Sequence, residues 1–177
     1  MTTEDPPLFP AGEFVPPGEY SQQQRATYID LLRAAPEKIT AAVEALDDSQ
    51  LDTLYRNWTV RQIVHHLADS HVNAYIRYKW ALTEASPLIK AYNETLWSET
   101  EDSKTAPIGC SLSMLSGLHS RWAELISCLD DDQFQRDYFH PQVGDVISLT
   151  QALPSYVWHT DHHVAQIQWV KAKHQWG

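Results

Sequence analysis

The sequence predicts an all-α fold that is preceded by an extended arm and interrupted by a short β-hairpin before the last helix. Three observations support this prediction. Apolar residues recur at helical spacing in four stretches, five prolines crowd the first twenty residues, and two short apolar segments flank a Gly-Asp turn. The chain has 177 residues, so we expect residues 1–177 to form a single domain with its own hydrophobic core.

The composition argues against several classes of function. A formal net charge of -10 at pH 7 opposes binding to nucleic acid or to an anionic membrane surface, because both need a basic protein face. No apolar run approaches the roughly 18 residues of a spanning helix, and the acidic N-terminus lacks the apolar core of a secretory signal. The two cysteines show no CxxC spacing. We therefore expect a cytoplasmic protein that binds neither nucleic acid nor membrane.

The chain begins with the arm and a first helical region. Prolines favour an extended conformation over residues 1–20, and Phe9 and Phe14 give this arm apolar groups with which to dock on the body. Residues 21–47 are apolar at helical spacing. Pro36 lies within this region, and because proline is favoured in the first turn of a helix, it predicts two helices, the second starting near Pro36.

The helix that follows Thr59 carries the clearest signals. Thr59 and Gln62 are spaced as a capping box, in which each side chain satisfies an orphan backbone donor of the other residue. Trp58 and Ile63 are spaced as a hydrophobic staple. We expect the helix to run to about Glu84, because a proline follows shortly after it.

A helical wheel separates the side chains of this helix. One broad face is apolar, and a polar stripe runs along its edge, made of Gln62, His66, Ser70, Asn73 and Arg77. His65 falls nearly opposite the apolar face, which makes it a poor candidate for an interior role. His71 lies on the apolar face, and the wheel alone does not exclude it as a ligand.

Beyond this helix the sequence predicts a long connection, a third helix, a hairpin and the last helix. Residues 86–110 form the connection, and their aromatic side chains argue against disorder. Ser111 or Ser113 caps the third helix, and residues 136–147 form the hairpin. The last helix covers about residues 148–173.

The last helix carries two histidines that one metal ion could share. His159 and His163 are four residues apart, so their side chains lie on one helical face with Cβ atoms about 6 Å apart. Buried imidazoles on such a face need polar partners, and a metal supplies one. His162 lies on another face, with Trp158. His66 is the candidate third ligand, although spacing alone leaves open that these histidines are packed or surface side chains.

Two motifs closely resemble the YfiT-like branch of the DinB-like superfamily. The first, WTVRQIVHHLADSH, covers Trp58–His71, and the second, YVWHTDHH, covers Tyr156–His163. Shorter similarities extend along nearly the whole chain and include the proline-rich arm. The resemblance implies a four-helix bundle, residues 21–177, with the arm of residues 1–20 attached to it.

The resemblance also implies a site with three histidine ligands for one divalent metal. The first ligand is the second histidine of the HHLADSH motif, His66, rather than His65 or His71. The others are the first and last histidines of the WHxxHH motif, His159 and His163. Zinc is the metal expected first, and nickel, manganese or iron would also accept imidazole ligands.

The resemblance further implies an enzyme. Three ligands leave positions free for water or substrate, which is the pattern of catalytic rather than structural metal sites. Such a site lowers the pKa of bound water toward about 7 or deprotonates a thiol. Family members are described as metal-dependent hydrolases, and relatives in the superfamily transfer low-molecular-weight thiols such as bacillithiol or mycothiol. We expect a small-molecule substrate and a homodimer; a non-catalytic metal-binding bundle is the alternative from another class.

Catalytic helpers are less well defined by the sequence. The side chains oriented toward the ligand faces are Asn73, Arg77, Tyr156 and Gln166, although ordinary buried polar groups would show the same pattern. Arg77 could hold an anionic group of the substrate or pair with a carboxylate of the bundle. Asp69, one turn from His66, could accept a hydrogen bond from its ring. His119 and His140 match family positions and are expected to be structural.

Overall fold

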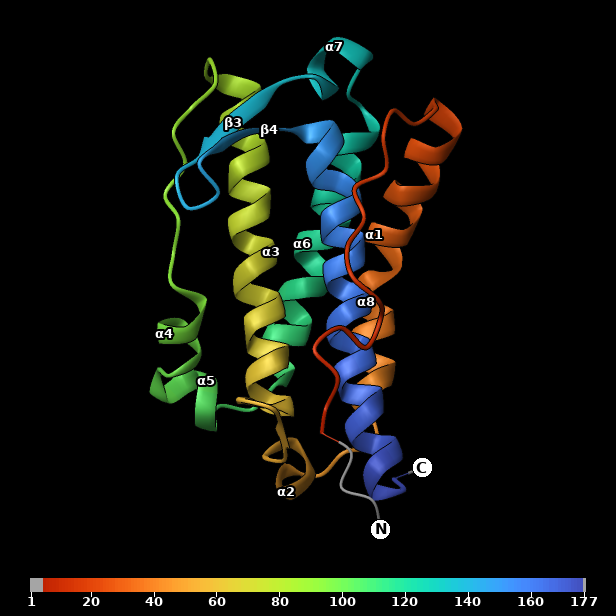
Figure 1. The fold of residues 1–177 in the computed structure, drawn as a ribbon, viewed down its shortest axis with the longest axis vertical. Coiled ribbons are helices and arrows are strands. Elements are labelled where there is room, and N and C mark those ends of the chain that lie inside the picture. Colours follow the sequence, from red (N-terminus) through yellow and green to blue (C-terminus); the bar gives the residue numbers. More distant parts are fainter. Residues whose placement is uncertain (1–4, 177) are drawn as a thin grey trace.

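The computed structural model describes residues 5–176, and four long helices make up most of it (Figure 1). The long helices are α1 (Gln22–Val43), α3 (Val60–Thr83), α6 (Gly109–Ser127) and α8 (Leu149–His174). Short helices lie between them: α2 (Asp48–Leu51), α4 (Glu94–Ser98), α5 (Glu101–Thr105) and α7 (Asp131–Phe134). Antiparallel hairpins pair β1 (Leu54–Tyr55) with β2 (Trp58–Thr59), and β3 (Asp137–His140) with β4 (Asp145–Ser148). The predicted all-α four-helix bundle, with a hairpin before its last helix, is confirmed.

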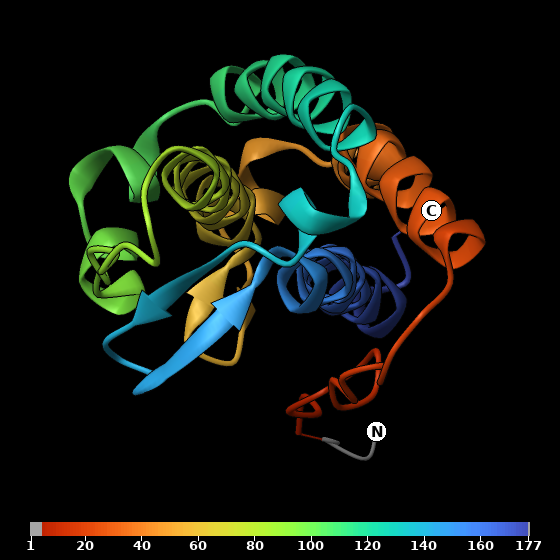
Figure 2. The same ribbon diagram turned by 90° about the horizontal axis from the view of Figure 1, so that it is seen from above.

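The four long helices form a ring in which α1 and α3 occupy opposite corners (Figure 2). Each of these two helices packs against both α6 and α8. The colours of Figure 1 show that α1 and α8 run downward and that α3 and α6 run upward, so α3 and α6 are parallel neighbours. Parallel neighbours need a long connection. Here residues 84–108 return beside α3, with α4 and α5 packed against it.

Helix α1 continues through Pro36, so the prediction that this proline starts a second helix is wrong. Proline lacks the N–H that would bond to the carbonyl four residues earlier, which here belongs to Leu32. The ring of His119, on the neighbouring helix α6, donates from Nδ1 to that carbonyl at 2.6 Å. A side chain therefore replaces the missing backbone bond, and the helix does not end.

Helix α8 also contains a proline, and there too a side chain donates to the carbonyl that the proline leaves free. It begins after Ser148, which forms a capping box with Gln151, and it contains Pro154 in its second turn. The carbonyl that Pro154 leaves without a helical partner is that of Thr150. The hydroxyl of Tyr20, at the end of the arm, donates to this carbonyl at 2.6 Å.

The starts of α3 and α6 differ in how well the sequence predicts them. The capping box of Thr59 and Gln62 is present with both hydrogen bonds, and α3 ends one residue before the predicted position. Helix α6 instead begins at Gly109, without a side-chain cap. The prediction that Ser111 or Ser113 caps it is therefore wrong.

The arm lies along α8, as its aromatic residues predict (Figure 1). The rings of Phe9 and Phe14 pack against Trp158, with centroids 6.4 and 5.7 Å away. The indole Nε1–H of Trp158 donates to the carbonyl of Gly12 at 3.0 Å. The first four residues of the predicted arm, and most of the acidic N-terminus, lie outside the described residues.

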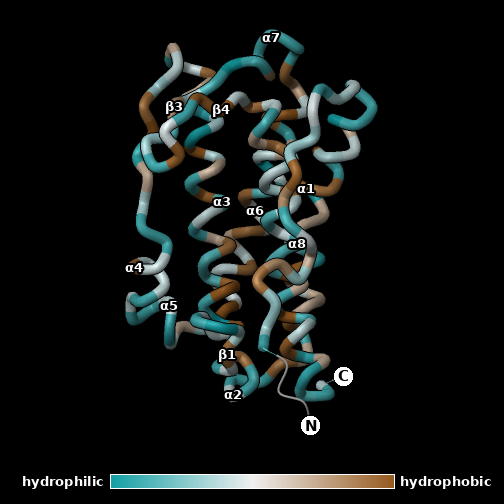
Figure 3. The backbone as a smooth tube through the Cα atoms, in the orientation of Figure 1, coloured by the Kyte–Doolittle hydropathy of each residue, from teal (hydrophilic) through white to brown (hydrophobic). Residues whose placement is uncertain are grey.

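The bundle core consists of two hydrophobic clusters separated by a polar layer. Hydrophobic residues recur along all four long helices (Figure 3). One cluster lies toward the end of the bundle that carries the β3–β4 hairpin, and the other toward the end that carries α2. Helices α3, α6 and α8 contribute histidines to the layer between them: His66, His71, His119, His159 and His163. No helix within residues 5–176 combines the length and the apolar character needed to cross a membrane.

Candidate metal centre

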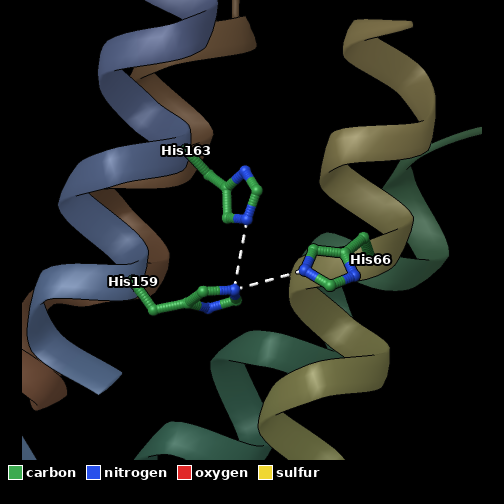
Figure 4. Close-up of side chains that lie close together, drawn as sticks. All are labelled: His66, His159 and His163. Carbon is green, nitrogen blue, oxygen red and sulfur yellow. Dashed lines mark hydrogen bonds between the residues drawn. The ribbon is translucent and has the colours of Figure 1, made fainter. Parts of the chain in front are cut away.

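Three histidine side chains from α3 and α8 converge in the polar layer (Figure 4). Nε2 of His66 lies 3.2 Å from Nε2 of His159, and Nε2 of His163 lies 3.1 Å from the same atom. One ring nitrogen of each histidine lies within 4.8 Å of those of the other two. The structure thus brings together the three residues that the sequence analysis names as metal ligands.

The local structure of the two helices accounts for this convergence. His159 and His163 are one turn apart on α8, so their rings leave the same face, with centroids 4.6 Å apart. His66 lies in the second turn of α3, whose start the capping box of Thr59 determines. Its ring packs on the indole of Trp58, the residue before that cap, at 4.6 Å.

Burial keeps the three rings uncharged at neutral pH. It lowers the pKa of His66, His159 and His163 well below the ordinary value of 6.5, and the neighbouring histidines lower it further. A neutral imidazole has one nitrogen with a lone pair, which is the form that binds metals. The centre therefore needs no deprotonation before it can accept a metal at pH 7.

A network of buried histidines connects His159 to the backbone of α1. His119 donates from Nδ1 to the carbonyl of Leu32 at 2.6 Å, and Nδ1 of His71 lies 2.7 Å from Nε2 of His119. Nε2 of His71 in turn lies 3.3 Å from Nδ1 of His159. His71 and His119 are completely buried, with 0% of their surface exposed. We call His119, His71 and His159 the histidine network.

The partners of this network assign the tautomer of each ring. A carbonyl only accepts, so His119 carries its proton on Nδ1 and accepts at Nε2. Nδ1–H of His71 therefore donates to His119, and Nδ1–H of His159 donates to His71. The lone pair of His159 is then on Nε2, which faces the other two candidate ligands. His163 donates from Nδ1 to Oε1 of Gln166 at 2.7 Å, so its lone pair also lies on Nε2.

This donor set fits a divalent cation. Nε2 of His159 and Nε2 of His163 each carry a lone pair and lie 3.1 Å apart, so neither can donate a hydrogen bond to the other. A positive ion between the two nitrogens removes their repulsion. Nitrogens bound at about 2.0–2.1 Å to a tetrahedral zinc ion are about 3.3 Å apart, close to the separations of 3.1 and 3.2 Å found here. Three imidazoles also suit nickel or iron.

A cavity of about 310 Å³ borders the three histidines. Its wall comes from α3, α8, β2, the connection that contains α4, and the β3–β4 hairpin. Besides the three histidines, its lining includes Trp58, Arg77, Tyr92, Glu94 and His140. The volume is at the lower end of the range for small-molecule sites.

The four candidate helpers fall in different places. Arg77 lines the cavity, and its Nη1 donates to the hydroxyl of Tyr156 at 3.1 Å. Gln166 accepts a hydrogen bond from Nδ1 of His163, one of the candidate ligands. Asn73 is absent from the cavity wall, and its amide donates to the backbone carbonyl of Asp69 at 2.9 Å.

Asp69 does not take the place that the sequence suggested for it. Within residues 5–176 its carboxylate forms no hydrogen bond with His66. Burial, followed by the charge of Asp102, raises the pKa of Asp69 to about 6. His71, which lies five residues after His66 on α3, is instead the residue that supports a candidate ligand: its Nε2 accepts a hydrogen bond from Nδ1 of His159.

Two further histidines show what a helical wheel can and cannot predict. His65, expected to be unsuited to an interior role, is only 8% exposed, and its ring bonds to Oγ of Ser111 at 2.7 Å and to the carbonyl of Ala106 at 3.1 Å. That expectation is wrong because the connection after α5 covers the side of α3 that faces away from the core. His162 points away from the centre, as predicted, and stacks on Trp158 with centroids 4.8 Å apart.

Sequence reasoning gave no ligand-supporting role to His71 or His119. Both lie on the apolar sides of their helices, where a buried imidazole must find a partner. Pro36 was the available signal, since a proline inside a helix leaves a carbonyl free for a side-chain donor. His140, expected to be structural, lines the cavity.

Comparison with known proteins agrees with the resemblance seen in the sequence. The family model of the DinB superfamily matches residues 31–167. The "Putative metal-dependent hydrolase YfiT" of Bacillus subtilis (strain 168) is 48% identical over 170 residues, which cover 95% of this chain and 96% of that protein. A "Putative metal-dependent hydrolase" of Geobacillus thermodenitrificans (strain NG80-2) is 40% identical over 178 residues, covering 99% of this chain and 100% of that one.

A solved structure shares the fold. YfiT from Bacillus subtilis, described as "a probable metal-dependent hydrolase with an unusual four-helix bundle topology", superposes with a TM-score of 0.93 at 48% sequence identity. The match covers 96% of this chain and 98% of that one. The bundle and its family were therefore both predicted correctly from the sequence.

Proposed function

The chain belongs to the DinB superfamily, and from that premise we propose that it is a metal-dependent hydrolase that acts on a small molecule bound in the cavity. The observation that carries this proposal is the convergence of three neutral imidazoles on the wall of that cavity. Relatives that are 40–48% identical over nearly the whole chain carry the name "Putative metal-dependent hydrolase", which supports the same conclusion.

His66, His159 and His163 would hold the metal. A divalent ion with three imidazole ligands supplies a Lewis acid that makes a water or a thiol nucleophilic near neutral pH. The histidine network and Gln166 keep the Nε2 lone pairs of His159 and His163 directed at the centre. Glu94 is the one carboxylate among the residues of 5–176 that line the cavity, and we propose it as the group that takes up a proton during hydrolysis.

The first test is the metal content of variants. His66→Ala, His159→Ala and His163→Ala should each lose the metal that the wild-type protein binds at one ion per chain. His174→Ala is a matched control, because His174 is also on α8 but is exposed. Elemental analysis after dialysis against trace zinc would measure the loss. Full metal content in any of the three ligand variants would refute this site.

The second test is activity and separates the alternatives. The metal-loaded protein should cleave at least one member of an ester and amide panel without added thiol, and chelation should abolish this turnover. Turnover that appears only when a thiol and an electrophile are both present would favour the thiol transferase implied by the resemblance. Unfolding on chelation, with no turnover under either condition, would favour a non-catalytic metal-binding bundle.

Several finer points are part of the proposal. Zinc is the metal that we propose first, because it is the usual partner of an open three-imidazole site. A homodimer and a cytoplasmic location are further proposals. Metal analysis of the purified protein and its mass in solution test the first two of these points.

A further inference from the structure

Arg77 is a buried cation on the wall of the same cavity. It lies on α3 and is only 9% exposed. Its Nη1 donates to the hydroxyl of Tyr156, whose ring lies 6.4 Å from the ring of His159. The guanidinium is therefore separated from the candidate metal centre by about one side chain.

Within residues 5–176 no carboxylate forms an ion pair with this cation. The one carboxylate on the cavity wall, Glu94, is not among its ion-pair partners. Buried charges in proteins are normally paired, because an unpaired charge loses its hydration without compensation. Arg77 is therefore a buried cation that has no anionic partner within residues 5–176, and a bound anion would explain this.

Four polar side chains around Arg77 carry no charge at pH 7. The side chains close enough to feel its charge include Tyr92, Tyr138, His140 and Tyr156. Burial raises the pKa of each tyrosine, to about 12 for Tyr92, and lowers that of His140, so all four are neutral at pH 7. They can solvate an anion beside the guanidinium, and none of them would repel it.

The free atoms of the guanidinium indicate the shape of the missing group. Nη1 is used by Tyr156, whereas Nε is buried and has no hydrogen-bond partner within residues 5–176. No hydrogen bond from Nη2 meets ordinary geometry within those residues, and the hydroxyl of Tyr138 lies close enough to the guanidinium to interact with it. Nε–H and one N–H of Nη2 point along the same edge of the guanidinium, and that edge matches the two oxygens of a carboxylate.

We propose that Arg77 binds a carboxylate of the substrate, so that the enzyme acts on small molecules that carry a carboxylate beside the reacting group. This inference rests on the proposed function, because the reacting group is the one that faces His66, His159 and His163.

Binding of dicarboxylates and their half-amides to the zinc-loaded protein tests this proposal without any turnover. The series from malonate to adipate varies the spacing between the two carboxylates, since one carboxylate can occupy the metal and the other Arg77. Isothermal titration calorimetry would compare each diacid with its half-amide. The expected result is a preference of about tenfold or more for the diacid at one or more spacings.

Variants assign that preference to Arg77. Arg77→Met should bind the diacid and the half-amide about equally, and Arg77→Lys should recover only part of the preference, because an ammonium lacks the planar fork. Lys79→Met removes one positive charge from an exposed position of the same helix and should behave like the wild type. Thermal melting of each variant would show that it is folded; if Arg77→Met is not, Arg77→Lys carries the test.

The outcomes separate this inference from the proposed function. Equal binding of diacids and half-amides by the wild type at every spacing, or the same preference in Arg77→Met, would overturn the role of Arg77 and leave the metal centre untouched. If 3-phosphonopropionate shows a larger Arg77-dependent preference than succinate, the assignment of a carboxylate is wrong. Full metal content in His66→Ala together with an Arg77-dependent diacid preference would refute the metal centre and support the role of Arg77.

Discussion

Replacing His71 with leucine should weaken metal binding although His71 is not a ligand. The change removes the acceptor for Nδ1–H of His159 and the donor to Nε2 of His119. His159 would then lose the partner that keeps its proton on Nδ1 and its lone pair on Nε2. The ring could rotate or change tautomer, and either event removes a nitrogen from the centre.

The size of the effect follows from the two hydrogen bonds. An unsatisfied buried donor or acceptor costs about 1–3 kcal/mol, so the free energy of unfolding should fall by about 2–6 kcal/mol, less whatever the leucine recovers by packing. Partners of metal-bound histidines typically contribute 10–100-fold to metal affinity, or about 1.4–2.8 kcal/mol. We expect His71→Leu to show both losses.

A matched variant separates the two losses. His65→Leu removes a histidine of the same helix that is 8% exposed and also has two hydrogen-bond partners, neither of which belongs to the centre. It should lower stability but leave the metal affinity unchanged. His71→Gln should recover part of the affinity, because a glutamine oxygen can accept from Nδ1–H of His159.

Competition with a zinc chelator, at a temperature where every variant is folded, measures these affinities. Equal affinity in His71→Leu and the wild type would refute the role of the histidine network. An equal loss of affinity in His65→Leu and His71→Leu would show that only general stability is involved.

Three further predictions concern stability. Tyr20→Phe leaves the carbonyl of Thr150 without its donor and should lower the free energy of unfolding by about 1–2 kcal/mol in a urea titration, with no change in metal affinity; an unchanged midpoint would contradict this. Asp69 has a pKa of about 6 when folded against about 3.9 when unfolded, so its ionisation destabilises the fold increasingly from pH 4 to 6 and by a constant amount above. Asp69→Asn should therefore raise the melting temperature at pH 7.5 and have little effect near pH 4. A larger increase at pH 4 than at pH 7.5 would refute the raised pKa of Asp69. Chelation should lower the melting temperature but preserve the helical circular dichroism signal, because both hydrophobic clusters pack without a metal; loss of the signal would contradict this.

The sequence predicts those features that depend on short-range rules. The capping box at Thr59 and Gln62 involves residues three apart, and the shared face of His159 and His163 follows from the pitch of one helix. The two motifs, Trp58–His71 and Tyr156–His163, identified the family and with it the bundle. For these features the structure adds distances to what the residue pattern already indicates.

Features that depend on the neighbouring element could not be predicted in this way. The wheel places His65 on the outer side of α3, but it contains no information about the connection that covers that side. Pro36 should end a helix by local rules, and only the position of α6 explains why His119 replaces the missing bond. The support that His71 gives to His159 likewise exists only once α3, α6 and α8 are assembled.

The coordination of the bound metal tests the central claim most directly. Extended X-ray absorption fine structure of the zinc-loaded protein should show three imidazole nitrogens at about 2.0–2.1 Å and at least one further light ligand. His163→Ala should lower the imidazole count or abolish binding. A spectrum with sulfur ligands, or with fewer than three imidazoles in the wild type, would contradict a centre built from His66, His159 and His163.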